Sequence, residues 1–301
     1  MKAVQFSRTG GPEVLRWVDI DEPHAGPGQV RISVRAAGVN PSDLMKMRTG
    51  RWKDKPIALP SGVGVEGAGI VDELGEGVAG VSVGDAVFGY GFNTAAQYAL
   101  MRGWARKPET LSFEEAAGFP VVVETATRIL AQVGVQAGET LLVSGAAGGI
   151  GSAVLQFARH RGIRVVGTAS AAKHDYLRGL GAMPTTYGAG LVERVRAIAP
   201  GGVDAALDLA GSGVIPELIE LVGDPSHVLS IVDATAPQHG AQVSFEVQQS
   251  PERVLVEAAR LYSAGAFRVF VARSFPLEQA AEAYRLSAAG HVTGKLVLTS
   301  S

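Results

Sequence analysis

The stretch 139–169 constrains the fold of this chain more than any other. It reads ETLLVSGAAGGIGSAVLQFARHRGIRVVGTA, so an apolar run leads into a glycine-rich turn, an amphipathic helix pattern and a second apolar run. Strand, tight turn, helix and strand in this order form a βαβ unit, whose first turn can approach a pyrophosphate closely. Gly148 would give the phosphate room, and Gly151 would let the helix pack against the strand. The stretch therefore predicts a dinucleotide-binding site.

The same glycines have three other interpretations. They also fit a plain strand-to-helix turn, an S-adenosylmethionine site or a short-chain dehydrogenase, and the first position of the G-x-G-x-x-G pattern is Ala146 here. A short-chain dehydrogenase would need a Tyr-x-x-x-Lys pair for proton transfer, and none of the six tyrosines has a lysine four residues on. The βαβ context favours the dinucleotide over all three.

Composition bounds the class of protein. A chain of 301 residues with 47% hydrophobic and 19% charged residues can bury a large core, and we expect two domains. A net charge of −2 argues against a nucleic-acid partner or an anionic membrane surface. The absence of cysteine excludes disulfides, thiolate zinc sites and a cysteine nucleophile. The N-terminus lacks a signal-peptide core and the longest apolar run, 116–123, is too short for a bilayer, so we expect a cytoplasmic protein without a membrane partner.

The spacing of turn-forming residues divides the chain into two kinds of segment. Residues 1–111 contain short β-like runs separated by Gly, Pro and Asp, which predict a barrel-like β domain with its longest irregular stretches at 40–60 and 89–93. From Ser112, which is followed by a glutamate three residues on as in a capping box, helices alternate with strands. Expected strands lie at 140–144, 165–168, 205–209, 228–231, 243–245 and 268–271, and expected helices at 150–160, 173–180, 191–198, 214–221 and 251–263.

This alternation predicts a doubly wound parallel sheet of the α/β class, with its ligand crevice at the carboxyl ends of the strands. The tail 277–301 holds one more helix and one more strand pattern, and we expect it to return to the first domain. The predicted domains are 1–111 with 265–301, and 112–264.

Several motifs along the chain carry a family resemblance. They are AAGVNPSDLMKMRTG (36–50), LPSGVGVEGAGIV (59–71), GVSVGDAVFGY (80–90), SFEEAAGFP (112–120), VQAGETLLVSGAAGGIG (135–151) and TGKLVL (293–298). Together they resemble the medium-chain dehydrogenase/reductase superfamily, and more narrowly its zinc-free quinone oxidoreductase branch. The resemblance implies a GroES-like β-rich barrel domain joined to a Rossmann domain, with hydride transfer from NAD(P)H.

The same resemblance predicts that the chain holds no metal. Zinc-dependent relatives carry a cysteine where this chain has Asn40 and a histidine where it has Val65, and neither an amide nor a valine suits zinc. The structural zinc lobe of four cysteines is missing as well, and the six histidines are scattered without ligand spacing. Glu66 remains, and we expect it to hold a loop by hydrogen bonds rather than to act in catalysis.

The residues after the second Rossmann strand favour NADPH over NADH. NAD sites of this type place a carboxylate about 20 residues after the glycine turn, whereas this chain has Gly-Thr-Ala-Ser at 167–170. Ser170 and Lys173 offer a hydroxyl and an ammonium suited to the 2′-phosphate. Tyr187 matches a family tyrosine that contacts the same phosphate. The alternative is that Lys173 is a solvated helix-face residue and Ser170 only a cap.

Further cofactor residues come from the glycine turn and from the resemblance. In the turn they are Ala147, Gly148, Gly149, Ile150 and Gly151, and by resemblance Ala210, Ile231, Val232 and Thr125 line the ribose and the nicotinamide. Arg128 is expected to be a charge on a helix surface. Homodimerisation through the sheet edge at 243–245 is also implied by resemblance.

Without zinc as a Lewis acid, the expected acceptor is an electrophilic small molecule, either a quinone or an α,β-unsaturated carbonyl. Asn40 is predicted to donate its amide N–H to the acceptor or the cofactor, although a turn residue before Pro41 is an equal interpretation. Tyr90 is a candidate proton donor. Asp43 is expected to fix the Asn40 loop. A second hypothesis is a non-catalytic NADPH-binding sensor or structural protein.

The loop after Asn40 departs from the family. Aliphatic residues stand where relatives often have an aromatic, namely Leu44, Met45 and Met47, so quinone specificity does not transfer simply. The same loop carries the basic cluster Lys46, Arg48, Arg51, Lys53 and Lys55, for which a solvated face is favoured over attraction of an anionic substrate.

Overall fold

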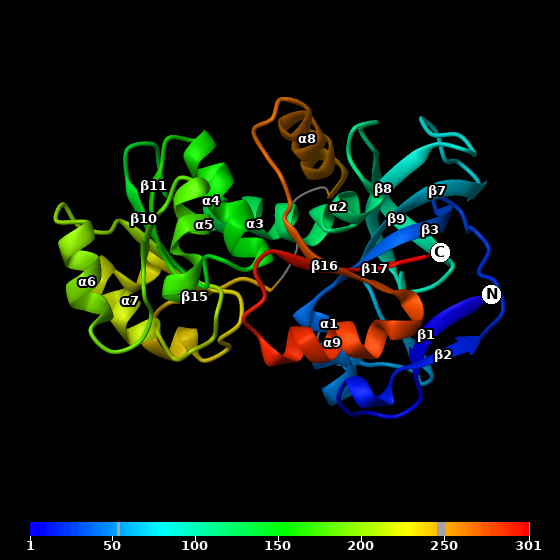
Figure 1. The fold of residues 1–301 in the computed structure, drawn as a ribbon, viewed down its shortest axis with the longest axis horizontal. Coiled ribbons are helices and arrows are strands. Elements are labelled where there is room, and N and C mark those ends of the chain that lie inside the picture. The colour runs from blue at the N-terminus through cyan, green and yellow to red at the C-terminus, as the bar shows by residue number, and fades with distance from the viewer. Residues whose placement is uncertain (53–54, 246–250, 301) are drawn as a thin grey trace. The chain divides into compact units, whose positions relative to one another are not determined.

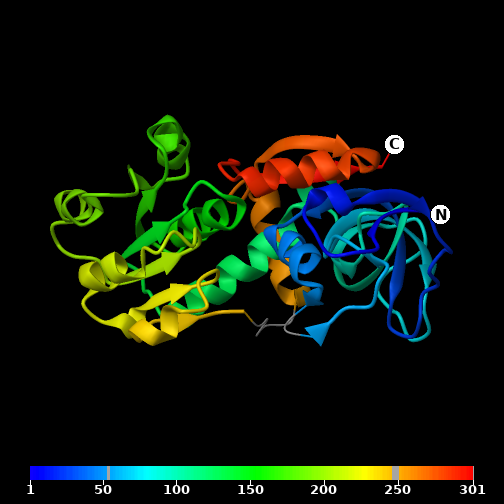
Figure 2. The same cartoon turned by 90° about the horizontal axis from the view of Figure 1, so that it is seen from below.

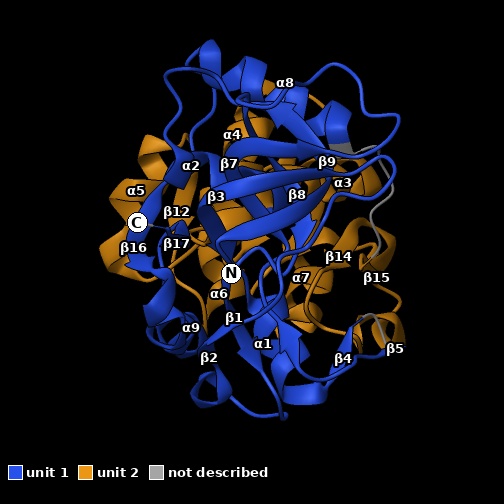
Figure 3. Ribbon diagram, turned by 90° about the vertical axis from the view of Figure 1, so that its right-hand side faces the viewer, with its two compact units in different colours: residues 1–121, 250–301 blue, residues 122–249 orange. Residues whose placement is uncertain are grey.

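The structure is a computed structural model that describes residues 1–52, 55–245 and 251–300. The chain forms two compact units, coloured separately in Figure 3: unit 1 contains Met1–Val121 and Ser250–Ser301, and unit 2 contains Val122–Gln249. The C-terminal tail thus packs within the same unit as the N-terminus.

Unit 1 is built on a curled, mostly antiparallel sheet. Its strand order is β16-β17-β3-β7-β8-β9, and β3 also pairs with β9, so the sheet curls back on itself. The strands are β3 (Val30–Val39), β7 (Glu66–Leu74), β8 (Ala86–Phe92), β9 (Tyr98–Arg106), β16 (Val271–Pro276) and β17 (Lys295–Thr299). Smaller pieces are the sheet of β1 (Lys2–Phe6), β2 (Arg16–Asp19) and β6 (Ser61–Gly62), and the pair β4 (Arg51–Trp52) and β5 (Lys55–Pro56). This is the β-rich barrel that the sequence predicts.

Two stretches expected to be irregular in unit 1 contain regular elements. Within 40–60 the chain forms α1 (Pro41–Thr49), which has proline in its first turn, Asp43 near its positive end and Gly50 as a left-handed C-cap at φ 65°. Within 89–93 strand β8 continues to Phe92 because β9 pairs with it, with a register shift between Tyr90 and Gly91. The irregular assignment was wrong for α1 because its buried face includes the charged Asp43 beside Leu44 and Met47, so apolar residues alone do not mark a helix there.

The segment after Ser112 starts as predicted but belongs to unit 1. Ser112 caps α2 (Phe113–Ala117), since its side chain accepts from Glu115 N at 3.1 Å. The Glu115 carboxylate accepts from Val269 N at 3.0 Å, whereas in a full capping box it would accept from the N–H of Ser112. Phe119 packs edge-to-face against Phe267, with ring centroids 5.1 Å apart. These contacts group residues 112–121 with unit 1, whereas we predicted a domain boundary at 112.

The helices of the C-terminal part also lie in unit 1. Helix α8 (Pro251–Ser263), placed by the sequence in the Rossmann domain, is tied to unit 1 because the Tyr262 hydroxyl donates to Thr110 O at 2.8 Å. It is followed by η5 (Leu277–Gln279) and α9 (Ala280–Ala289). The short helix η1 (Pro12–Val14) completes the described helices of this unit.

Unit 2 contains a parallel six-stranded sheet with the order β12-β11-β10-β13-β14-β15. The strands are β10 (Thr140–Ser144), β11 (Arg164–Thr168), β12 (Met183–Thr185), β13 (Ala205–Asp208), β14 (Val228–Ser230) and β15 (Gln242–Val243). The order runs outward from β10 in both directions, which is the doubly wound topology of a Rossmann fold. The predicted α/β class with a parallel sheet is confirmed.

One strand that the sequence analysis assigned to this sheet lies in unit 1 instead. The expected strand at 268–271 begins only at Val271 and pairs with β17 in unit 1, as β16. The strand missed by the sequence analysis is β12, three residues with a central proline, which pairs with β11 at the sheet edge. Proline is tolerated in an edge strand because one side needs no ladder hydrogen bond.

The helices of unit 2 are seen around this sheet in Figures 1 and 2. They are α3 (Phe119–Val133, which begins in unit 1), α4 (Gly149–His160), α5 (His174–Gly179), α6 (Leu191–Ile198) and α7 (Ile215–Val222), with the short helices η2 (Ala171–Lys173), η3 (Pro225–His227) and η4 (Ala236–His239). Among the residues with described positions, no helix combines the length and apolarity that a membrane span requires.

Candidate functional site

The predicted cofactor residues of unit 2 lie at the carboxyl ends of its strands. The register aligns the carboxyl ends of neighbouring strands: Thr168 pairs with Thr185, Val143 with Gly167, and Ser144 with Asp208. The predicted residues directly follow these ends, on five adjacent strands. They are Tyr187 after β12, Ser170 and Lys173 after β11, the turn residues 147–151 after β10, Ala210 after β13, and Ile231 and Val232 after β14.

The glycine turn leaves space where the sequence predicts phosphate. A Cβ added to Gly148 would have only Gly145 O within 4 Å, at 3.6 Å, so this position opens away from protein. A Cβ on Gly151 would lie 2.6 Å from both Gly145 O and Ala146 O, so this glycine lets α4 pack against the turn. Gly148 is the N-cap of α4, followed by Gly149, Ile150 and Gly151 in its first turn. The helix N-terminus therefore presents backbone N–H groups beside open space.

A hydroxyl pair that the sequence analysis missed supports this turn. The Tyr176 hydroxyl donates to Ser152 Oγ at 2.9 Å, and Ser152 Oγ donates to Gly148 O at 2.8 Å. Burial raises the pKa of Tyr176 and keeps it protonated as a donor, against the opposing effect of the Ser152 hydrogen bond. The pair connects α5 to the first turn of α4, and no motif in the sequence signals it.

The three residues predicted for the 2′-phosphate lie next to each other in strand order. Ser170 and Tyr187 each come two residues after the paired Thr168 and Thr185. Ser170 occupies the N-cap position of η2 but makes no side-chain cap hydrogen bond, so the cap interpretation finds no support. Lys173 ends η2, and partial burial lowers its pKa. Tyr187 is 53% exposed.

Arg194 holds the loop that carries Tyr187. Its guanidinium donates to Thr186 O at 3.0 Å, to Gly188 O at 3.0 Å and to Ala189 O at 2.8 Å. A planar fork of donors suits this task because it can bind several carbonyls at once. Arg194 is thus a structural residue that the sequence analysis did not identify.

A buried carboxylate organises the loops after β13 and β14. Asp208 accepts from Ala210 N at 3.1 Å and Gly211 N at 3.0 Å, and its other oxygen accepts from Ser230 Oγ at 2.9 Å. Ser230 Oγ in turn accepts from Val232 N at 3.1 Å. Asp208 and Ser230 are both fully buried. The loop conformations predicted to line the ribose and the nicotinamide therefore depend on one side-chain network.

Thr125 and Arg128 both lie buried on α3. Thr125 Oγ1 is 3.5 Å from Glu124 Oε2. The Arg128 guanidinium pairs with Glu124 at 2.8 Å and donates to Ser244 O at 3.2 Å and to the Ser244 hydroxyl. The expectation that Arg128 is a surface charge is wrong, because its side chain anchors the segment after β15 and remains only 6% exposed.

In unit 1 Asn40 belongs to a buried charged cluster. Its Nδ2 donates to Glu66 Oε1 at 2.7 Å, and its Oδ1 accepts from Lys295 Nζ at 2.7 Å. Lys295 Nζ also lies 2.7 Å from Glu66 Oε1, and Glu66 Oε2 accepts from Val121 N at 2.7 Å. All three side chains are at most 5% exposed. Glu66 therefore holds the Asn40 loop, as expected, and Lys295 is the partner that the sequence analysis missed.

A second buried pair fixes α1. Asp43 accepts from Gly64 N at 3.0 Å and from the Tyr284 hydroxyl at 2.9 Å. Burial raises the pKa of Asp43, against the lowering effect of these hydrogen bonds. Burial and the neighbouring Asp43 also hold the pKa of Tyr284 well above its ordinary value. Asp43 thus fixes the loop, which was its predicted role.

The Tyr90 hydroxyl already has an acceptor. Tyr90 lies on β8 opposite Glu66 of β7, and its hydroxyl donates to Pro120 O. A proton donated to a main-chain carbonyl is not directly available to an acceptor, so this geometry argues for packing rather than proton transfer.

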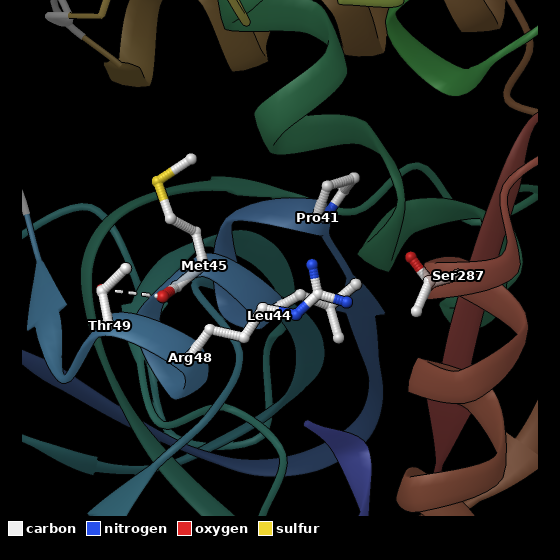
Figure 4. Close-up of a pocket in the computed structure, with 7 residues that line it drawn as sticks. Pro41, Leu44, Met45, Arg48, Thr49 and Ser287 are labelled. Atoms are coloured by element: carbon white, nitrogen blue, oxygen red, sulfur yellow. Dashed lines mark hydrogen bonds between the residues drawn. The ribbon is translucent and has the colours of Figure 1, made fainter. Parts of the chain in front are cut away.

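Two hollows flank α1 within unit 1. The first, of about 320 Å³, is lined by Pro41, Leu44, Met45, Arg48, Thr49, Ser287 and Ala288. Figure 4 shows the Arg48 side chain extending past Leu44 toward the helix that carries Ser287. Met45 is 65% exposed here, whereas Met47 is fully buried in the core, so only one of the two methionines lines this hollow.

The second hollow, of about 380 Å³, lies on another side of α1. It is lined by Gln5, Lys46, Trp52, Ile57, Ala58, Pro60, Ser61, Gly62, Gly64, Val65, Phe92 and Asn93. Lys46 Nζ donates to Gly62 O at 2.7 Å, and burial lowers the Lys46 pKa. The prediction of a solvated face therefore fails for Lys46; Lys53 of the same cluster lies outside the described residues.

No metal-binding cluster is present in the parts of the chain that the structure describes. Within 1–52, 55–245 and 251–300, no three His, Cys, Asp or Glu side chains come together in a way that could hold a metal ion.

Comparison with known proteins supports the family assignment. Residues 26–129 match the family described as alcohol dehydrogenase GroES-like domain, and residues 180–298 match the family described as zinc-binding dehydrogenase. The chain is 35% identical to a pikromycin polyketide synthase component of Streptomyces venezuelae over 91% of its own length, but it spans only 8% of the length of that relative.

Other relatives match over most of both chains. A quinone oxidoreductase of Pseudomonas aeruginosa is 30% identical over 99% of each protein, and an NADPH-dependent alkenal/one oxidoreductase of Arabidopsis thaliana is 30% identical over 99% of this chain and 79% of that one. The solved structure of the quinone oxidoreductase from Coxiella burnetii is 31% identical, with a TM-score of 0.86 over 99% of each chain. The chain belongs to the quinone oxidoreductase type of the medium-chain dehydrogenase/reductase superfamily.

Proposed function

We propose that this chain is an NADPH-dependent oxidoreductase that reduces a quinone or an α,β-unsaturated carbonyl without zinc. The observation that carries the proposal is the arrangement at the carboxyl ends of the unit 2 strands. Gly148 leaves room there for a phosphate, and the predicted cofactor residues follow five adjacent strands. The relatives named for quinone and for alkenal/one reduction support the reaction class.

The residues at these strand ends suit the parts of an NADPH molecule. The turn at 147–151 would hold the pyrophosphate through its N–H groups. Ser170, Lys173 and Tyr187 would hold the 2′-phosphate, and the described segment 167–173, Gly-Thr-Ala-Ser-Ala-Ala-Lys, contains no carboxylate to repel it. Ala210, Ile231 and Val232, fixed by Asp208 and Ser230, would line the rest of the nucleotide. When bound, the reduced nicotinamide supplies the hydride.

Zinc independence is supported by what surrounds Asn40. The position at which zinc-dependent relatives carry a ligand already has an ammonium, Lys295 Nζ, at 2.7 Å from both Asn40 Oδ1 and Glu66 Oε1. A second cation at this place would be repelled. One N–H of the Asn40 amide is donated to Glu66, and the other is the group that would orient a polar ligand atom.

Enzyme assays with the purified chain test the function. NADPH oxidation is followed with a panel of quinones and enones, and bound zinc is measured in the same preparation. We expect turnover with electrophilic acceptors only and no stoichiometric zinc. Bound NADPH without turnover across the panel would instead favour a non-catalytic sensor or structural protein.

Replacing Lys173 tests the choice of nucleotide. A charge-assisted hydrogen bond contributes about 1.5–3 kcal/mol, so Lys173→Met should weaken NADPH binding about 10- to 100-fold. NADH binding should change little, because NADH lacks the 2′-phosphate. Calorimetric titration of both nucleotides measures this, with Arg196→Met, an exposed cation on α6, as control. An equal effect on the two nucleotides would contradict the assignment of Lys173.

A further inference from the structure

We propose that Lys46 binds the carbonyl oxygen of the acceptor, in the hollow of unit 1 that Trp52, Val65 and Phe92 also line. This inference rests on the proposed function, and it names the residue that fixes and polarises the substrate.

The position of the ammonium is the first argument. Lys46 lies on α1, six residues after Asn40, and lines the hollow; its Nζ donates to the main-chain oxygen of Gly62, another lining residue, at 2.7 Å. An ammonium carries three N–H donors. Gly62 O is the one acceptor recorded for Lys46 among the residues with described positions, so further donors remain for a ligand.

The walls of the hollow are the second argument. Trp52, Ile57, Val65 and Phe92 give it apolar and aromatic surface, and Gln5, Ser61 and Asn93 add a few neutral polar groups. An apolar pocket with few polar groups is the usual site of a small organic ligand, and the polar groups fix its orientation. A flat conjugated carbonyl, which is apolar apart from one oxygen, matches this lining.

The connection to Asn40 is the third argument. Val65 lies next to Glu66, which binds Asn40 and Lys295 directly. Gly64, another lining residue, donates its N–H to Asp43 of α1. The hollow is thus held by the same contacts that hold the Asn40 loop.

The charge of Lys46 suits the proposed reaction. When hydride adds to the β-carbon of an enone, the π electrons move onto the carbonyl oxygen, and a nearby ammonium stabilises that negative charge. A proton from water then binds the α-carbon and completes the saturated ketone. Burial makes this interaction stronger than it would be in water, while Asp43 of the same helix favours the charged form of Lys46. The other hollow beside α1 has Arg48 at its surface and no aromatic lining, so it fits this ligand less well.

Binding without nucleotide tests the assignment apart from turnover. Calorimetry compares benzalacetone, an aromatic enone, with the hydrocarbon in which a methylene replaces its carbonyl oxygen. Since the chain has no cysteine, the enone is not lost to thiols. We expect Lys46→Met to weaken benzalacetone binding about 10- to 100-fold, with no effect on the hydrocarbon. Lys46→Arg should retain most of the affinity, and Lys55→Met, at an exposed lysine nearby, should behave as wild type.

Two results would overturn the assignment: equal benzalacetone affinity for wild type and Lys46→Met, or no binding by the wild type. A wild type that binds benzalacetone through Lys46 but never oxidises NADPH would overturn the proposed function and still support this ligand site. Affinity for NADPH itself should be unchanged in Lys46→Met, which shows that the variant is folded.

Discussion

Glu66 is tightly fixed in unit 1, because three donors bind its fully buried carboxylate. Removing one partner of a buried ion pair leaves an uncompensated charge, which costs about 3–5 kcal/mol. We expect Lys295→Met to lower the free energy of unfolding by this amount, as measured by denaturant titration. Lys2→Met, which breaks the exposed pair with Asp19, should cost less than about 1 kcal/mol. Equal losses in the two variants would refute the structural role of the Lys295–Glu66 pair.

The pH dependence of acceptor binding follows from Lys46. An ammonium binds a carbonyl oxygen only while it is protonated, and burial lowers the Lys46 pKa although the Asp43 charge opposes this shift. Affinity for benzalacetone should therefore fall as pH rises, at a pH below the ordinary lysine pKa of about 10.4. In Lys46→Arg the fall should disappear from this range, since arginine stays charged. Titrations at increasing pH measure both, and an unchanged pH profile in Lys46→Arg would contradict the assignment.

Among the elements, the turn between β10 and α4 can be tested for two separate roles of glycine. Gly148 has open space around its missing side chain and a φ of −71°, so Gly148→Ala should keep the stability of the wild type. The added methyl should instead obstruct the phosphate and weaken NADPH binding by about 1–3 kcal/mol. Nucleotide titration and thermal unfolding together measure this.

Gly151→Ala should behave in the opposite order. Its Cβ would lie 2.6 Å from two carbonyl oxygens, so the fold itself should lose about 1–3 kcal/mol. Gly179→Ala, where nothing lies within 4 Å, is the matched control and should be neutral. Equal destabilisation by Gly148→Ala and Gly151→Ala would contradict the open space at Gly148, and unchanged NADPH affinity of Gly148→Ala would contradict a phosphate site there.

Elements marked by a clear pattern of apolar residues could be predicted from the sequence, whereas elements that depend on tertiary contacts could not. β10 and α6 have the predicted bounds because buried apolar residues mark them continuously or at helical spacing. β12 was missed because three residues with a proline carry no period, and it exists only through pairing with β11. Lys295 was missed for a similar reason: its partner Glu66 is 229 residues away in sequence. Side-chain networks of this kind leave no local pattern.

At the scale of the whole molecule, the edge strand β15 provides the remaining test. β15 is the last strand of the unit 2 sheet and pairs only with β14 among the described strands, while Phe245 just beyond it is 52% exposed. An exposed strand edge with a neighbouring aromatic side chain is a surface that a second copy can cover. Arg128 and Gln132 of α3 fix this strand by donating to the main-chain oxygens of Ser244 and Val243.

We propose that two copies pair along this edge to form a homodimer, and that Phe245→Asp weakens it because each interface would then bury two uncompensated charges. Light scattering should show a dimeric wild type and a monomeric variant at the same concentration. Phe270→Asp, at a similarly exposed aromatic of unit 1, should remain dimeric, since this residue lies on the other unit. A monomeric wild type would refute the dimer, and a dimeric Phe245→Asp together with a monomeric Phe270→Asp would place the interface on unit 1 instead.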